Sequence, residues 1–105
     1  MKKIIGVCAC PAGIAHTYLA AENLENLAKK RGYIAKVETN GSSGVENRLT
    51  NEDISEADFV IIAADTKVEM ERFRGKKLIE VSVTDAIRKG EDIFNRADND
   101  QINVY

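Results

Sequence analysis

The hydrophobic positions of this 105-residue chain alternate between short continuous apolar runs and longer stretches with helical spacing. The clearest apolar run covers residues 58–64 and has Phe59, Val60, Ile61 and Ile62 at its centre. A near-continuous apolar run indicates a strand that is buried on both faces, as in a parallel sheet. Similar runs predict further strands over residues 3–9, 33–38 and 76–81.

Helical spacing follows the first strand. Between residues 16 and 31 apolar side chains recur at intervals of three and four, which predicts an amphipathic helix with Gly32 as its C-terminal stop. A weak helix is expected over residues 51–56, capped by Thr50 or Asn51, with Asp53 in its first turn.

The second half of the chain continues the alternation. A short helix is predicted over residues 68–73. Thr84 is the expected N-cap of a last helix, which Gly90 weakens. The residues from Asp98 to the end are polar, and we expect residues 98–105 to form a frayed tail.

Strands that alternate with helices predict an α/β fold: a single open four-stranded parallel sheet with helices on both faces. Ligands of such sheets bind beyond the carboxyl ends of the strands, at the topological switch point. Three predicted loops meet at that edge, and they cover residues 10–16, 40–44 and 65–67. The functional site is expected there.

The composition and charge of the chain argue against some classes of function. The chain is 44% hydrophobic and 30% charged, which suits one compact domain, and its net charge of −2 gives no electrostatic footprint for nucleic acid. No apolar run approaches the roughly 20 residues of a membrane span. Met1-Lys2-Lys3 leads directly into a strand without a signal-peptide pattern. We therefore expect a cytoplasmic protein without direct membrane insertion.

The loop after the first strand carries the strongest chemical signal. A cysteine ends the strand, and the loop enters a helix through the segment Cys10-Pro11-Ala12-Gly13-Ile14-Ala15-His16-Thr17. Backbone N–H groups at a helix start lack intrahelical partners and attract anions. They favour a thiolate and would also hold a phosphoryl group. We predict Cys10 as the nucleophile, with residues 11–17 as its phosphate cradle.

Cys8 has a simpler interpretation. It lies two residues before Cys10, a spacing that is poor for a structural disulfide, and free cysteine is usually a small buried hydrophobe. Two thiols and the single histidine, His16, are too few for a zinc site. Cys8 is therefore expected in the core, and we expect neither a metal nor a cofactor.

The loop has the frame of the low-molecular-weight tyrosine phosphatases, in which Cys, five residues and Arg are followed by Ser or Thr. Here His16 stands in the arginine position, and Thr17 follows it. Histidine lacks the planar fork that stabilises a transferring phosphoryl group, so the loop is suited to holding phosphate rather than hydrolysing it. His16 either bonds the phosphoryl group, tunes Cys10 or begins the helix. Thr17 is either an N-cap-type hydroxyl or a phosphate ligand.

Other polar residues at this edge leave alternatives open. Asp65 is either a catalytic acid or a helix N-cap, and Gly41 and Gly44 are turn residues or ligands. Five basic residues form either a solvated face or a docking site for an acidic partner: Lys67, Arg72, Arg74, Lys76 and Lys77.

These segments resemble the fructose-type enzyme IIB domain of the bacterial phosphoenolpyruvate-dependent sugar phosphotransferase system. The resemblance rests on the segment from Cys10 to Thr17 and on Val37-Glu38-Thr39-Asn40-Gly41-Ser42-Ser43-Gly44, in the same order and spacing. Shorter matches support it, namely Ala20-Ala21-Glu22, Ala63-Ala64-Asp65 and Glu71-Arg72-Phe73. The family commonly has Thr in place of Ala12 and Gln in place of Asn40.

The resemblance implies a phosphotransferase component. Cys10 would accept a phosphoryl group from a phosphohistidine of a IIA protein and pass it to a sugar, by default fructose, bound by a membrane IIC protein. It also implies the strand order 2-1-3-4, one domain over residues 1–105 and a cytoplasmic location at the inner membrane through IIC. The rival interpretations are a cysteine phosphatase and a non-catalytic signalling domain.

Overall fold

A single mixed sheet forms the centre of the computed structural model, which describes residues 2–11, 15–41 and 44–105. The strand order is β3-β2-β1-β4-β5. The strands are β1 (Lys3–Ala9), β2 (Ile34–Gly41), β3 (Gly44–Glu46), β4 (Phe59–Ala64) and β5 (Leu78–Val81). Strands β2, β1, β4 and β5 are parallel, whereas β3 pairs with β2 in the antiparallel sense.

The predicted four-stranded, purely parallel sheet is therefore wrong in one respect. The parallel part has the predicted order, but β3 adds a fifth strand at the edge. Residues 39–41, expected in a loop, extend β2, and Asn40 pairs with Val45 of β3. Gly44 begins β3 with φ of 102°, a conformation that favours glycine. All three residues of β3 are exposed, so no burial pattern marked them as a strand.

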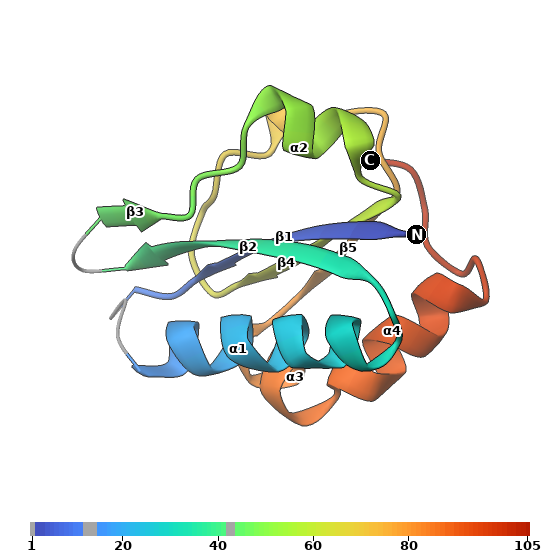
Figure 1. Ribbon diagram of the computed structural model, residues 1–105. Coiled ribbons are helices and arrows are strands. Elements are labelled where there is room, and N and C mark those ends of the chain that lie inside the picture. Colours follow the sequence, from blue (N-terminus) through green and yellow to red (C-terminus); the bar gives the residue numbers. More distant parts are fainter. Residues whose placement is uncertain (1, 12–14, 42–43) are drawn as a thin grey trace.

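Helices cover both faces of the sheet, as predicted. Figure 1 shows α1, α3 and α4 against one face and α2 against the other. The helical elements are α1 (Ala15–Lys30), α2 (Asn51–Glu56), the 3₁₀ turn η1 (Glu71–Phe73), α3 (Val83–Arg88) and α4 (Gly90–Asp98).

The sheet separates two hydrophobic clusters. Along β1, Ile4 and Cys8 face the cluster under α1, α3 and α4, whereas Ile5 and Val7 face the cluster that contains Ile54 of α2. All four side chains are buried, as expected for a central strand of a parallel sheet. This double burial fixes the position of β1 and of the residue that follows it.

The helix boundaries confirm some predictions and correct others. Thr50 caps α2 in a capping box: the Asp53 N–H donates to Thr50 Oγ1, and the Thr50 N–H donates to Asp53 Oδ2. The helix predicted over residues 68–73 is only the short turn η1. Thr84 is not the N-cap of α3, because the Ser82 hydroxyl accepts the Asp85 N–H at 3.1 Å.

The C-terminal residues are not a frayed tail. Ile102 is buried against the larger cluster, and this single apolar anchor brings the chain end beside β5. The Leu78 N–H donates to the Asn103 carbonyl at 3.0 Å, and the Tyr105 N–H donates to the Lys76 carbonyl at 2.9 Å. Within the described parts of the chain, none of the helices combines the length and apolar character needed to cross a membrane.

Candidate functional site

Cys10 is the first residue beyond β1, at the carboxyl edge of the parallel strands. Ala9 is in register with Asn40 of β2 and with Ala64 of β4. The chain therefore leaves β1 between the ends of two neighbouring strands, where the strand order reverses. Cys10 is half-buried and packs against the larger hydrophobic cluster. Cys10 therefore lies at the edge of the sheet where the sequence predicted the functional site.

Thr17 lies directly against the sulfur of Cys10. Its hydroxyl donates a hydrogen bond to Cys10 Sγ over 3.1 Å, and the Thr17 side chain is fully buried. Thr17 is the third residue of α1, so its interpretation as an N-cap hydroxyl is wrong. A donated hydrogen bond stabilises negative charge on its acceptor, so this contact would favour the thiolate form of Cys10.

The start of α1 faces the solvent beside Cys10. Pro11, Ala15 and His16 are exposed, and the first turn of α1 carries no acidic residue. The predicted cradle residues Ala12, Gly13 and Ile14 lie outside the described residues. A helix start without carboxylates favours an anionic group nearby.

The exposed ring of His16 lies beside a cleft between two helices. This cleft has a volume of about 220 Å³ and is lined by His16, Leu19, Thr84, Ile87 and Arg88. The cleft joins the start of α1 to the start of α3, and both elements lie on the face of the sheet that Cys10 packs against.

Cys8 is much more deeply buried than Cys10. It is completely buried in β1, and burial raises the pKa of its thiol to about 12. A buried thiol of this kind is inert near neutral pH, since the thiolate is the reactive form. The prediction that Cys8 fills the core is confirmed.

Asp65 follows β4 and forms hydrogen bonds both to the end of β1 and to the start of α3. Its N–H donates to the Ala9 carbonyl at 2.9 Å, and its Oδ1 accepts the Val83 N–H at 3.3 Å. Val83 is the first residue of α3, so Asp65 acts as a helix-capping group, although not for the helix expected after its own loop. This contact also holds the chain after β4 next to the end of β1.

Sequence reasoning missed a buried ion pair at the same edge. Arg72 donates two hydrogen bonds to the Glu38 carboxylate, at 2.8 and 2.7 Å, and Glu38 is only 1% exposed. Glu38 Oε1 also accepts the Leu49 N–H at 2.9 Å. The only signal for this pair was the carboxylate of Glu38 beside the apolar Val37, and no neighbouring residue indicated its partner.

Four of the five basic residues in the predicted basic face make contacts within the chain. Arg74 pairs with Glu71, Lys77 pairs with Asp100, and Lys76 donates to the carbonyls of Ser55 and Ala57. The Arg72 side chain is only 13% exposed and pairs with the buried Glu38, so the interpretation as a solvated face is wrong for it.

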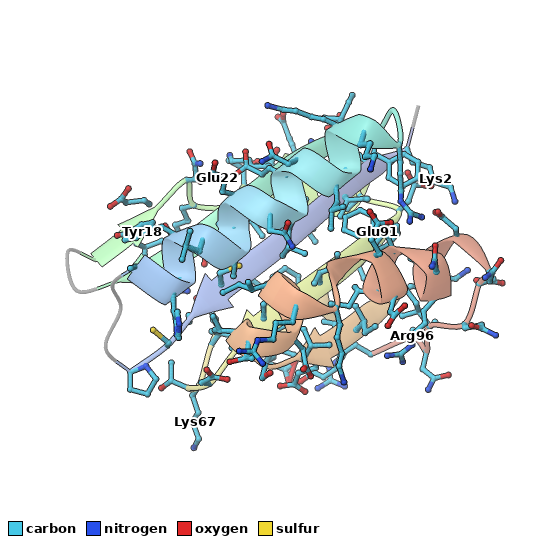
Figure 2. All side chains as sticks on the ribbon, turned by 90° about the horizontal axis from the view of Figure 1, so that it is seen from below. Lys2, Tyr18, Glu22, Lys67, Glu91 and Arg96 are labelled. Carbon is cyan, nitrogen blue, oxygen red and sulfur yellow. The ribbon has the colours of Figure 1, made fainter. Side chains whose placement is uncertain are left out.

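Lys67 differs from the other four cations, which each make an ion pair or donate to a backbone carbonyl. It has no acidic partner within 4.0 Å among the residues that the structure describes. Figure 2 shows it at the end of the sheet opposite Lys2, which lies beside the start of β1. Lys67 is therefore at the carboxyl edge, where Cys10 lies.

Comparison with known families and proteins gives consistent results. Residues 5–96 match the family described as "PTS system, Lactose/Cellobiose specific IIB subunit". The chain is 50% identical over 97 residues to the "PTS system fructose-like EIIB component 2" of Escherichia coli K12, covering 91% of this chain and 92% of that protein. It is 48% identical over 103 residues to the "PTS system fructose-specific EIIABC component" of Bacillus subtilis, covering 98% of this chain but 16% of that protein.

Solved structures agree with these matches. A domain of a fructose-specific IIABC component from Borrelia burgdorferi superposes with a TM-score of 0.93 at 47% identity and covers 99% of this chain and 98% of its own. The solution structure of an enzyme IIB subunit from Escherichia coli K12 has a TM-score of 0.86 at 42% identity, covering 92% and 91%. The similarity extends over sequence and fold together.

Proposed function

The chain belongs to the IIB family of the bacterial sugar phosphotransferase system, in its fructose-type branch, and we propose that Cys10 is the residue on which it carries a phosphoryl group. The observation that carries this proposal is the hydrogen bond from the buried Thr17 hydroxyl to Cys10 Sγ at the start of α1. A thiol at a central strand end, with a donor aimed at its sulfur, is suited to nucleophilic attack.

The first transfer needs little chemistry beyond the nucleophile. The Cys10 thiolate attacks phosphorus in line, the S–P bond forms, and the P–N bond of the donor's protonated phosphohistidine breaks, so that the donor imidazole leaves neutral. The transferred group carries about −1.5 to −2 charges. Pro11 has no N–H to donate, so the backbone N–H groups of residues 12–15 and the start of α1 would bind its oxygens, with Thr17 next to the sulfur and His16 at the rim.

The second transfer releases the phosphoryl group to a sugar. A sugar hydroxyl attacks phosphorus, the S–P bond breaks, the Cys10 thiolate returns, and the hydroxyl proton passes to a base on the acceptor side. We propose fructose as the sugar, since the relatives are named fructose-like and fructose-specific. No arginine stands at position 16 to promote hydrolysis, which favours delivery over release of phosphate.

The partners follow from the same proposal. The donor would be a phosphorylated IIA protein, and the acceptor would be sugar bound to a membrane IIC protein. Relatives named as EIIABC and EIIB'BC components support this, since their names combine these units. Residues 1–105 would act as a single IIB domain in the cytoplasm, held at the inner membrane through IIC.

Phosphoryl transfer followed by intact mass tests the proposal. Wild type, Cys8→Ser and Cys10→Ser are incubated with a phosphorylated fructose-type IIA protein. We expect one thiol-linked phosphoryl group on wild type and on Cys8→Ser, and none on Cys10→Ser. Label that persists on Cys10→Ser contradicts the proposal. Hydrolysis of p-nitrophenyl phosphate that depends on Cys10 would instead support a phosphatase.

A further inference from the structure

The Glu38–Arg72 ion pair joins two parts of the chain that β1 separates. Glu38 is on β2, whereas Arg72 belongs to η1 in the connection from β4 to β5. Strand β1 lies between β2 and β4, and Val7 of β1 is in register with both Glu38 and Ile62. The pair therefore connects the two sides of β1, close to the strand end that carries Cys10.

The contacts around the pair fix several segments at once. Glu38 accepts two hydrogen bonds from the Arg72 guanidinium and a third from the Leu49 N–H. Arg72 Nε also donates to the Glu69 carbonyl at 3.0 Å. The end of β2, the segment before α2 and the β4–β5 connection are thus held to one another by directional bonds.

Stability alone does not explain a pair of this kind. Removing two charges from water carries a desolvation cost that their attraction repays only in part, and apolar residues of similar volume often serve as well or better. Glu38 is 1% exposed, and the Arg72 side chain is 13% exposed. What such a pair provides that an apolar contact does not is fixed geometry, since a bidentate guanidinium–carboxylate contact sets both distance and orientation.

The pair lines a cleft near the carboxyl end of β1, the strand that Cys10 follows. Asn40 at the end of β2 and Lys67 in the β4–β5 connection line one cleft of about 230 Å³, together with Glu38 and Arg72. The cleft therefore lies between the end of β2, where Asn40 is in register with Ala9, and the connection that follows β4. A shift of either segment changes the surface that an incoming phosphoryl donor meets.

We propose that the Glu38–Arg72 pair is a positioning element for phosphoryl transfer, which holds the β2 end and the β4–β5 connection in the arrangement that admits the donor to Cys10. This inference rests on the proposed function of Cys10. The pair does not touch the reacting atoms. It acts through the two segments that it joins, and misplacement by about 1 Å is enough to cost about a hundredfold in rate.

Replacing both charged residues with uncharged ones tests the positioning role of the pair separately from its effect on stability. In the double variant Glu38→Gln/Arg72→Met, residue 38 keeps an oxygen that can accept the Leu49 N–H, and no charge is left buried. The matched control is Glu71→Gln/Arg74→Met, which removes a bidentate pair of the same chemistry from the same 3₁₀ turn, where both side chains are largely exposed. The conservative variant Arg72→Lys keeps the charge but loses the fork.

Three measurements are made on each protein: the thermal midpoint, the rate of Cys10 alkylation by iodoacetamide, and the rate of phosphoryl transfer from phosphorylated IIA. We expect Glu38→Gln/Arg72→Met to keep its thermal midpoint within a few degrees and its alkylation rate within about threefold, while transfer falls at least tenfold. Arg72→Lys should be intermediate in transfer, and the control pair should match wild type in all three.

The outcomes distinguish this inference from the proposed function. Transfer at the wild-type rate in the double variant, or in a folded Arg72→Lys protein, overturns the positioning role. So does a loss of transfer that follows the thermal midpoint across all variants. Absence of phosphate on Cys10 of the wild type overturns the proposed function instead, and alkylation then still reports whether the pair affects the thiol itself.

Discussion

The Thr17 hydroxyl donates a hydrogen bond to the sulfur of Cys10 across 3.1 Å, from a side chain with no exposed surface. The contact joins the first residue after β1 to the first turn of α1. A hydrogen bond to a charged acceptor contributes about 1.5–3 kcal/mol, which is tenfold or more in an equilibrium. This contact therefore has enough energy to decide how much of Cys10 is thiolate.

Replacing Thr17 tests that contact. Thr17→Val keeps the shape but removes the donor, and we expect alkylation of Cys10 at neutral pH to slow about tenfold, since less thiolate is present. The pH midpoint of alkylation should move upward. Thr17→Ser keeps the donor and should stay within about threefold of wild type. Equal rates for Thr17→Val and wild type would show that the bond does not stabilise the thiolate.

The two cysteines should differ sharply in reactivity. Burial raises the pKa of Cys8 to about 12, so at pH 8 only about one molecule in ten thousand carries its thiolate, a factor of ten for each pH unit. Iodoacetamide at pH 8 should modify Cys10 and leave Cys8 unmodified until the protein is unfolded in urea. Peptide mapping reads both sites in one experiment. Modification of Cys8 in the folded protein would mean that β1 opens on the labelling timescale.

Much of the fold was predictable because its signals are local. The apolar run that forms β4 is buried on both faces, so its composition alone identified it. Thr50 and Asp53 form their capping box within a single turn. Strand β3 carries no such signal, because all three of its residues are exposed, including the apolar Val45. Ile102 is the only buried residue of the segment 98–105, which is too little to predict an anchored chain end.

The sequence was enough to predict which loop carries the site, but not which side chains contact one another there. The strand end and the helix start indicated Cys10, and the structure locates it at that edge. Thr17 was identified without its sulfur contact, although it shares the buried stripe of α1 with Ala20 and Leu24, a signal for an inward hydroxyl. The partner of Arg72 is 34 residues away in the sequence, so only the three-dimensional fold reveals their pairing.

Glycine is a poor helix former, but the packing around position 90 leaves no room for a larger residue. A Cβ atom at this position would lie 2.5 Å from Leu27 Cδ1 and 2.9 Å from Asn23 Nδ2. Asn23 cannot easily move, because its amide donates to the carbonyls of Ala86 and Ile87 at the end of α3. We expect Gly90→Ala to lower the free energy of unfolding by about 1–3 kcal/mol, despite alanine's higher helix propensity.

A second substitution identifies the cause of that loss. Leu27→Ala removes the nearest clashing atom, so the double variant Leu27→Ala/Gly90→Ala should be more stable than the sum of the two single effects predicts. Urea unfolding of the four proteins gives this coupling. Strict additivity would mean that Gly90→Ala acts on the backbone and not through the contact with α1.

Lys67 should contribute to the encounter with an anionic donor. It lies at the carboxyl edge without an acidic partner among the described residues, and a phosphoryl group carries about −1.5 to −2 charges. We expect Lys67→Ala to lower the second-order rate of phosphoryl transfer about threefold at low ionic strength, with the difference lost near about 0.5 M salt. Lys30→Ala, at the far end of α1, is the control and should have no effect at either salt concentration.

Acid should weaken the fold partly through Glu38. Burial acts to raise the pKa of this carboxyl, but the Arg72 guanidinium and the Leu49 N–H outweigh it, so the pKa lies below its ordinary value of 4.5. The unfolded chain therefore binds the proton more readily than the folded protein. The resulting stability is fully present above about pH 4.5 and is lost as the pH falls through the lower folded value.

Urea unfolding between pH 7 and pH 3 measures this effect. Wild type should lose stability below about pH 4.5, and Glu38→Gln/Arg72→Met should lose less over the same interval, because residue 38 no longer titrates. Glu71 supplies the control, since its pKa is also lowered by Arg74 but the pair is largely exposed, where ion pairs contribute little. Glu71→Gln should therefore follow the wild-type curve. If the Glu38→Gln/Arg72→Met variant loses stability in acid as steeply as wild type, other carboxylates cause the loss. Asp53, which pairs with Lys3 and Lys36, would then be the first to examine.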